Sequence, residues 1–488
     1  MKKPLLSLLA VTCIAVTSQM ISCTPTITYQ PVRSDEPGPH MYYDSTRYRL
    51  NEMIVIFKKP PTTKGVDQMK EAIGKQGINP DLIKMRKCNS CNAYVELWQA
   101  PDLETAVHSE GLVGGTGSRR GSQGVGEDSL AYYSLNFRQD VEMDSSAHFR
   151  DFNYSAYVPV KSDTAGKDVI RIAVLDTGID ADRIISTDYL WTNQRELSAG
   201  IKGREIDNDN NCYIDDTFGW NFVDGTNDVK DLHRNLHGTL VSHYIINQFA
   251  RSEHNAVKIM TLKTHDKEGK GYLFASICAI HYAIEKKANI INASWGFYYY
   301  DDRPHPYLNK LITEDLRSEG ILFVTAAGNR IEAVDDRARI IYQDAHGVLI
   351  PDSLLRNLEY HNFYPACLSN DANNVVTVTT ADTTRVSPTQ NYSPMYVDMG
   401  AIPDEITPNF MKFNVPFPGP ITTISGSSFA TAIMTGRIGA LLPMSSYLSG
   451  IDKGVLNQVE APPGAAPFTK SSFLKKWRIR NGRITPRN

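Results

Sequence analysis

The chain has 488 residues, of which 41% are hydrophobic and 22% are charged, and its formal net charge is −3. This composition is ordinary for a soluble globular protein, and the length allows one large domain or two to three smaller ones. Because basic residues do not dominate any stretch with a folding pattern, the sequence does not indicate a nucleic-acid-binding protein.

The first 22 residues have the pattern of a secretion signal. Two lysines follow Met1, and residues 5–16 form a short apolar run, which is typical of a signal peptide and too short for a comfortable membrane-spanning helix. The segment from Met20 to Cys23 resembles the lipobox of bacterial lipoproteins, although Met20 stands where leucine is more usual. The resemblance implies lipidation of Cys23 and an exported protein anchored to a bacterial membrane, on its periplasmic or cell-surface side. The alternative is a plain signal peptide cut nearby, with Cys23 incidental.

A small mixed domain is expected after a polar tether at residues 23–47. The candidate strands cover residues 53–57, 82–86, 93–98 and 132–142, and the candidate helices cover residues 66–75 and 103–109. This order of elements is that of a small ferredoxin-like domain, which we assign to residues 48–144. The Gly- and Ser-rich stretch 111–126 is predicted to be a loop within it.

The cysteines do not indicate a disulfide framework. Once Cys13 in the signal and Cys23 are set aside, an odd number remains, although export would permit disulfides. Cys88 and Cys91 form a lone CxxC, which could be a local disulfide, a redox pair or a tight turn between two strands. The turn is the simplest interpretation, because a zinc site would need further ligands of this kind.

From about residue 165 the pattern predicts a different, larger domain. Strand-like apolar runs occur at 170–175, 257–262, 290–293, 322–326 and 375–378, and helical runs occur at 240–249, 274–286, 308–318 and 428–442. Apolar strands that alternate with helices indicate an α/β fold, with a parallel sheet covered by helices on both faces. We assign residues 145–450 to this domain and residues 451–488 to a C-terminal extension. Functional side chains are expected at the carboxyl ends of its strands.

Four polar residues stand at the end of a predicted strand or at the start of a predicted helix. Asp176 ends an apolar strand, His237 and Ser428 each begin a helix, and Asn329 ends a strand of small residues. Taken alone each is weak evidence, because an aspartate at a strand end often caps a turn and a serine at a helix start is usually an N-cap. Their order along the chain is more informative, because Asp, His and Ser in this order is one of three known arrangements of the serine protease triad.

The motifs around these residues resemble the four signature blocks of subtilisin-like serine proteases, the subtilases. The blocks are DTG at Asp176, HGT at His237, AAGN at Asn329 and GSSFA at Ser428. The segments that resemble the substrate-binding strands of the family are Gly269, Lys270 and Gly271, and Ser294, Trp295 and Gly296. The chain departs from the family at Leu240, where histidine is common, at Ser427, where threonine is usual, and at Ala432, where proline is usual. None of these differences removes a catalytic group.

The resemblance implies a serine endopeptidase of the subtilisin-like fold that acts on proteins or peptides and needs no cofactor for the chemistry. Ser428 would attack the peptide carbonyl, His237 would carry the proton, Asp176 would orient His237, and Asn329 would donate to the oxyanion. It also implies that residues 48–144 are an inhibitory prodomain, since residues 141–144 resemble the end of such propeptides. The alternative is a catalytically silent binding lipoprotein with the same fold.

An acidic stretch between Asp176 and His237 has the oxygen spacing of a calcium-binding loop. The candidate ligands are Asp207, Asp209, Asn211 and Asp215. The stretch departs from an EF-hand, because Cys212 occupies the place of the turn glycine and no glutamate arrives at the twelfth position. A structural Ca²⁺ ion is therefore one expectation. A solvated loop held by turns of its own Asp and Asn side chains is the other.

Overall fold

The structure is a computed structural model, and it describes residues 47–445 with gaps, together with short pieces of the C-terminal extension. The gaps are residues 93, 108–129, 142–148, 156, 160, 182, 199–205, 251, 299–304, 331–338, 340–342, 344–346, 352–353, 361, 371, 382–385, 402–412 and 415–422, and the later pieces are 453, 468–469, 477–480 and 483–486. The predicted signal peptide, Cys23, the tether and the Gly-rich loop lie outside the described residues. Among the helices that are described, none is long and apolar enough to span a membrane.

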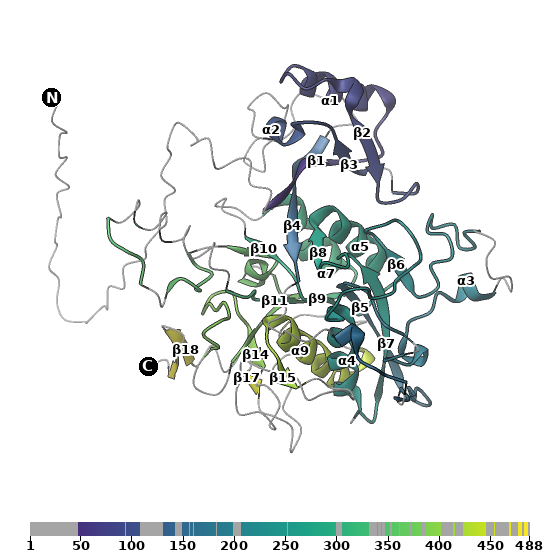
Figure 1. Cartoon of the computed structure of the whole chain (residues 1–488), viewed down its shortest axis with the longest axis vertical. Coiled ribbons are helices and arrows are strands. Elements are labelled where there is room, and N and C mark those ends of the chain that lie inside the picture. Colours follow the sequence, from purple (N-terminus) through teal and green to yellow (C-terminus); the bar gives the residue numbers. More distant parts are fainter. Residues whose placement is uncertain are drawn as a thin grey trace. The chain divides into compact units, whose positions relative to one another are not determined.

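An eight-stranded sheet forms the centre of the larger part of the chain (Figure 1). Its order is β17-β14-β13-β11-β9-β5-β7-β6, and neighbours pair in parallel except β17, which is antiparallel to β14. The strands are β5 (Asp168–Asp176), β6 (Gly219–Asn221), β7 (Asn255–Lys263), β9 (Ile290–Ala293), β11 (Leu322–Ala326), β13 (Val375–Thr380), β14 (Met399–Ala401) and β17 (Phe468–Thr469). The predicted parallel α/β sheet is confirmed.

Helices cover both faces of this sheet because its strands alternate between two apolar sets. Ile172 and Val174 of β5 pack with α4 (His237–Phe249) and α9 (Ser427–Leu441) in one core, whereas Ala173 and Leu175 belong to the other core with α5 (Leu273–Glu285). A second helical segment on the α5 side consists of α6 (Pro306–Lys310), a π-helical turn η4 (Leu311–Asp315) and α7 (Leu316–Ser318). Each parallel strand is buried on both sides, as its continuous apolar sequence predicts.

The described residues 47–92, 94–107 and 130–141 form a smaller sheet with helices α1 and α2, which we call the N-terminal unit. Its elements in chain order are β1 (Tyr48–Phe57), α1 (Thr63–Gly74), β2 (Lys84–Lys87), β3 (Val95–Gln99), α2 (Leu103–Val107) and β4 (Leu130–Asp140). All its strand pairs are antiparallel, in the order β2-β3-β1-β4. Helix α1 starts where the side chain of Thr62 accepts a hydrogen bond from the Gly65 amide at 3.2 Å, an N-cap that lies before the predicted helix.

The sheet of the N-terminal unit continues into the larger part of the chain. Strand β4 pairs antiparallel with β8 (Lys270–Tyr272), so that β8 becomes the fifth strand of the smaller sheet. The remaining short elements are α3 (Gln194–Ser198), the 3-10 turns η1 (Pro80–Leu82), η2 (Phe149–Asp151), η3 (Thr187–Tyr189) and η6 (Ala366–Asn370), and the pairs β10 (Phe297–Tyr298) with β12 (Phe363–Tyr364), β15 (Phe413–Asn414) with β16 (Thr423–Ile424), and β18 (Trp477–Arg480) with β19 (Arg483–Pro486).

Candidate active site

Asp176 and His237 meet at the carboxyl end of β5. The Nδ1 atom of His237 lies 2.7 Å from Oδ1 of Asp176, and the Thr177 amide donates to the same oxygen at 2.8 Å. Both side chains are buried, with 1% and 0% of their area exposed. Burial alone would raise the pKa of Asp176, but the charge and hydrogen bond of His237 lower this pKa below its ordinary value. The aspartate is therefore ionised and orients the imidazole.

Two glycines of the signature motifs are explained by a close approach of backbones. A Cβ atom on Gly238 would lie 2.4 Å from the carbonyl oxygen of Gly178, which itself has a φ of +111°. The Gly238 amide donates to the Thr177 hydroxyl at 2.9 Å. The turn after Asp176 and the start of the helix at His237 therefore touch, and this contact brings the acid and the base together.

Helix α4 begins at His237 without a cap of its own. Its N-cap residue Leu236 has a left-handed backbone (φ 51°, ψ 46°) and makes no side-chain cap. The buried carboxylate of Asp231 takes this role, because its Oδ2 accepts from the Thr239 amide at 3.0 Å and from the Thr239 hydroxyl at 2.8 Å. The other oxygen of Asp231 accepts from the His233 amide at 3.0 Å. Burial raises the pKa of Asp231 to about 6. Sequence motifs do not point to Asp231, which precedes His237 by six positions in an ordinary polar loop.

Ser428 lies in the first turn of α9. Its Oγ donates to the carbonyl oxygen of Ser294 at 2.9 Å, and the Ser294 hydroxyl donates to the Ser428 carbonyl oxygen at 3.0 Å. The ring of the next residue, Phe429, has its centroid 5.3 Å from that of His237. The start of α9 therefore lies beside the imidazole. The Nε2 atom of His237 makes no hydrogen bond within the described part of the chain, so the Ser428 hydroxyl is turned away from it here.

Asn329, which follows β11, is held at the same helix terminus. Its Oδ1 accepts from the amide and the hydroxyl of Ser427 at 3.0 and 3.2 Å. Its side-chain nitrogen, Nδ2, makes no hydrogen bond to any residue that the structure describes. An N–H donor that is left unpaired next to a helix N-terminus can bind a developing negative charge.

The predicted substrate strand at Gly269–Gly271 is paired with the N-terminal unit. Gln139 is opposite Gly271 and Asp140 is opposite Lys270, and the Val141 amide donates to the Gly269 carbonyl oxygen at 2.9 Å. A Cβ atom on Gly271 would lie 2.8 Å from the Gln139 carbonyl oxygen. The backbone of residues 139–141 therefore occupies the edge to which an extended peptide would add.

Side chains reinforce this pairing at the start of α5. The helix has no cap from its own N-cap residue, Tyr272, but the side chain of Asn136 accepts from the Phe274 amide at 2.9 Å. The Ser276 hydroxyl donates to Gln139 at 2.6 Å. The N-terminal unit thus supplies the cap of a helix in the larger part of the chain.

The second predicted substrate segment, Ser294 to Gly296, runs past Ser428. Trp295 is 2% exposed and its ring belongs to the core, so only its backbone could meet a substrate. A Cβ atom on Gly296 would lie 2.3 Å from the Phe363 ring, which explains the need for glycine at this position.

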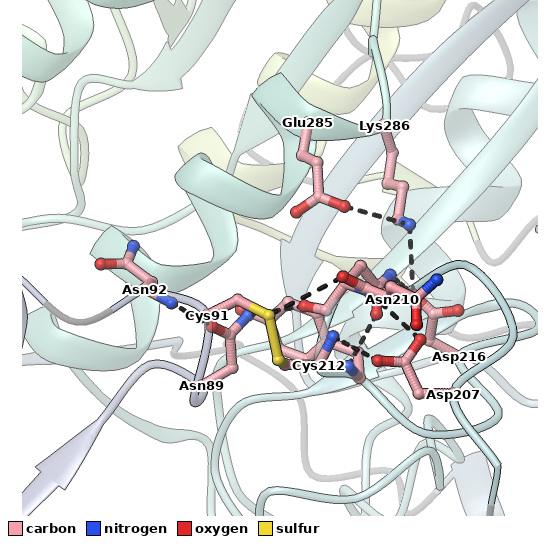
Figure 2. The surroundings of a disulfide bond; sticks show 11 residues. Asn89, Cys91, Asn92, Asp207, Asn210, Cys212, Asp216, Glu285 and Lys286 are labelled. Carbon is pink, nitrogen blue, oxygen red and sulfur yellow. Dashed lines mark hydrogen bonds and ion pairs between the residues drawn. A yellow bond between two sulfur atoms is a disulfide. The ribbon is translucent and has the colours of Figure 1, made fainter.

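The acidic loop is held by internal hydrogen bonds and by a lysine (Figure 2). Asp207 accepts from the amides of Asn211 and Cys212 at 3.1 and 2.6 Å. Asp209 pairs with the ammonium group of Lys286 at 2.5 Å, and although burial would raise the pKa of Asp209, this contact lowers it.

Of the predicted calcium ligands, Asp207 and Asp209 come within 4.8 Å of each other and of Glu196, whereas Asp215 is not in this group. The Asn211 side-chain oxygen accepts from the Tyr213 amide at 2.7 Å. Backbone amides and Lys286 satisfy the oxygens of Asp207 and Asn211 and the Oδ2 of Asp209, whereas the buried Oδ1 of Asp209 has no hydrogen-bond partner among the described residues. Calcium stays a prediction.

The CxxC is a turn, as expected, but its cysteines are bonded far away in the chain. The Asn92 amide donates to the side chain of Asn89 at 2.6 Å, which closes the turn. Cys88 forms a disulfide with Cys278, and Cys91 forms one with Cys212. A disulfide between the two cysteines of the motif is therefore excluded.

The comparisons with known proteins agree with the motifs. The model of the subtilase family, peptidase S8, matches residues 166–449. Subtilisin-like protease 1 of Plasmodium berghei is 29% identical over 59% of this chain and 45% of its own length, and that of Plasmodium vivax is 33% identical over 43% and 30%. The chain therefore spans less than half the length of these relatives.

Among solved structures, the epidermin leader peptide processing serine protease of Staphylococcus aureus is 17% identical, with a TM-score of 0.42 over 80% of this chain and 87% of that one. The family match covers more than half of the chain. The chain belongs to the subtilase family.

Proposed function

We propose that this protein is a serine endopeptidase that hydrolyses peptide bonds with Asp176, His237 and Ser428 through an acyl-enzyme intermediate. The observation that carries the proposal is the buried 2.7 Å contact between His237 Nδ1 and Asp176, next to the first turn of α9, which contains Ser428. Nδ1 donates to the carboxylate, so Nε2 of the neutral ring is an acceptor and can take the proton of the serine hydroxyl.

Catalysis would require the Ser428 hydroxyl to leave the Ser294 carbonyl oxygen and to turn toward Nε2 of His237. The leaving amine would then take the proton back from His237. The oxyanion would be bound by the amide nitrogen of Asn329 and by the backbone amide of Ser428 at the N-terminus of α9.

We further propose that the protein is made as a zymogen, with residues 48–144 as its inhibitory prodomain. The pairing of residues 139–141 with the edge at Gly269–Gly271 supports this, because a bound substrate would use the same backbone groups. The prodomain would therefore compete directly with substrates. Export and lipid anchoring at Cys23, on the periplasmic or cell-surface side of a bacterial membrane, are part of the proposal and rest on the N-terminal sequence.

Self-cleavage tests the proposed chemistry. The wild-type chain should give two fragments on a reducing denaturing gel, and its serine should react with a fluorophosphonate probe. Ser428→Ala should stay uncut and unlabelled, whereas Ser318→Ala, which removes an exposed hydroxyl elsewhere, should behave as wild type. If the wild-type chain does not cut itself, and does not react even after another protease and a dithiol reductant have released the prodomain, it is not a protease.

That result would favour a silent binding protein of the same fold. This alternative is favoured by one observation. The Ser428 hydroxyl donates a hydrogen bond to the Ser294 carbonyl oxygen, while Nε2 of His237 has no hydrogen-bond partner among the described residues. Labelling of the wild type would exclude it, because the probe reacts only with an activated serine.

A further inference from the structure

Two disulfides join the N-terminal unit to the rest of the chain. Cys88 is bonded to Cys278 of α5, and Cys91 is bonded to Cys212 of the acidic loop, across 190 and 121 residues of sequence. Both cysteines of one short turn are therefore tied to the proposed enzyme, at two separate elements.

Non-covalent contacts hold the same turn against the same elements. The Asn89 side chain donates to the Asn211 carbonyl oxygen at 3.2 Å, and the Arg86 guanidinium donates to the Phe222 carbonyl oxygen at 2.8 Å. Figure 2 shows the turn beside the acidic loop and the end of α5.

The two elements that receive the disulfides are themselves fastened together. The hydroxyl of Tyr282, on α5, donates to Asp216 at 2.7 Å, and the ammonium of Lys286 lies 2.5 Å from Asp209. The acidic loop with Cys212 and helix α5 with Cys278 are therefore held against each other by these two contacts.

We propose that the processed protein keeps its prodomain as a covalently bound subunit, and that a dithiol reductant is needed to release it. This rests on the proposed function, in which the chain is cut after the prodomain. Such a cut breaks one peptide bond and leaves both disulfides intact. A tethered inhibitor acts at an effective concentration of about millimolar, which can strengthen its binding by a factor of about 10²–10⁴. The cut enzyme therefore stays latent.

The exposures of the four cysteine residues set the order in which the two disulfides are reduced. Cys91 is exposed, Cys88 and Cys212 are half-buried, and Cys278 is 1% exposed. A thiolate of the reductant attacks Cys91 Sγ, the bond to Cys212 breaks, and Cys212 leaves as a thiolate that takes a proton. The second thiol of the reductant then attacks the mixed disulfide, which frees Cys91 as a thiol and leaves the reductant oxidised.

The same exchange follows at Cys88. It displaces Cys278, so release consumes two dithiols and produces four protein thiols. The remaining cysteine of the larger part, Cys367, is buried and forms no disulfide, so it provides a control.

The covalent link can be tested without the protein's own activity. A recognition sequence for a site-specific protease is inserted after residue 145 of the Ser428→Ala chain, and the purified protein is cut there. On a denaturing gel without reductant we expect one band of full mass, which separates into two bands with dithiothreitol. The single variants Cys88→Ser and Cys91→Ser should still give one band, the double variant should give two, and Cys367→Ser should match its parent. Two bands from the parent without reductant would overturn the proposal.

Latency is tested with the wild-type chain on a fluorogenic peptide. After self-cleavage, dithiothreitol should raise the activity by a factor on the order of 100, with the appearance of four thiols per chain. Full activity before reduction, with no further increase afterwards, would overturn the proposed latency. If the wild-type chain never cuts itself while the site-specifically cut chain stays linked, the proposed protease function fails and the covalent attachment stands.

Discussion

Replacement of Asp231 should change both the stability of the protein and the rate of peptide cleavage, because this carboxylate caps the helix that begins at His237. The carboxylate accepts from the amide and the hydroxyl of Thr239 and from the His233 amide. Asp231→Asn keeps an oxygen for the two Thr239 donors but presents an NH₂ group to the His233 amide. One buried donor is then left without an acceptor, which costs about 1–3 kcal/mol of stability.

The ionisation of Asp231 also makes the free energy of unfolding depend on pH. Its folded-state pKa is raised to about 6 from the ordinary value of 3.8, chiefly by burial. The folded protein therefore binds this proton more tightly than the unfolded chain, and the resulting stability is present below pH 3.8 and is lost as the pH rises through 6. At 1.36 kcal/mol per pKa unit, the loss is about 3 kcal/mol. An asparagine at this position does not ionise, so the Asp231→Asn protein does not lose this stability as the pH rises.

Asp231→Asn should therefore be less stable than its parent near pH 4 by about 1–3 kcal/mol, and the deficit should vanish or reverse by pH 7. Urea unfolding at pH 4, 5, 6 and 7, in the Ser428→Ala background to prevent self-digestion, measures this difference. Other groups that titrate in this range are common to both proteins and cancel. A deficit that stays constant from pH 4 to pH 7 would refute the raised pKa of Asp231.

The rate of peptide cleavage provides a second test of the role of Asp231. Without its cap the first turn of α4 loosens, and small misplacements of a catalytic group can cost up to about 10²-fold in rate. Asp231→Ala, which removes every acceptor, should lower kcat with little change in KM, because the substrate edge at Gly269–Gly271 is untouched. An unchanged kcat would mean that the start of α4 holds His237 without Asp231.

Three further substitutions test other parts of the site. Asn329→Ala should lower kcat by about 10²–10³, the effect known for loss of such a donor in subtilisin, and an unchanged kcat would remove Asn329 from the oxyanion site. Gly271→Ala should weaken inhibition by the proposed prodomain about 10-fold or more, because the new Cβ would lie 2.4 Å from the His265 ring and 2.8 Å from the Gln139 carbonyl oxygen; an unchanged inhibition constant would mean that the edge shifts to accommodate the methyl group. Lys286→Met should destabilise the protein by about 3–5 kcal/mol by leaving Asp209 unpaired, and thermal unfolding should show no effect of a chelator on the wild type. A melting temperature that falls on chelation would instead support calcium in the acidic loop.

The strands of the sheet and helix α9 could be predicted because their signals are local. Strand β5 was expected at residues 170–175 and spans Asp168–Asp176, and α9 was expected at 428–442 and spans Ser427–Leu441. Apolar runs and helical spacing determine such elements within a few residues. The close contact with the Gly178 carbonyl oxygen explains the glycine at 238, and the φ of +111° and the nearby Val229 carbonyl oxygen explain the glycine at 178.

Details that depend on side-chain orientation could not be predicted. Nothing in the sequence around Ser428 indicates that its hydroxyl turns to the Ser294 carbonyl. The surroundings of the acidic loop could not be predicted for a related reason. The spacing of its oxygens predicts a cation, which stays a prediction, but it does not indicate that Lys286, far away in the sequence, pairs with Asp209. Only the folded arrangement of α5 against the loop brings the two together.

The CxxC shows why a local interpretation can be correct and still miss the function. Its spacing predicts a turn, and a turn is present between β2 and β3, but disulfide partners depend on which surfaces meet in the folded protein. Cys278 lies inside an apolar helix and Cys212 inside a polar loop, so neither has a neighbour that marks it as a partner. The start of α5 makes the same point, because its cap comes from Asn136 of another unit. The N-terminal unit caps a helix of the larger part and shares two disulfides with it, so the unit that we propose to be inhibitory is also part of the scaffold around the site. Its removal should therefore demand a chemical step in addition to a cut in the chain.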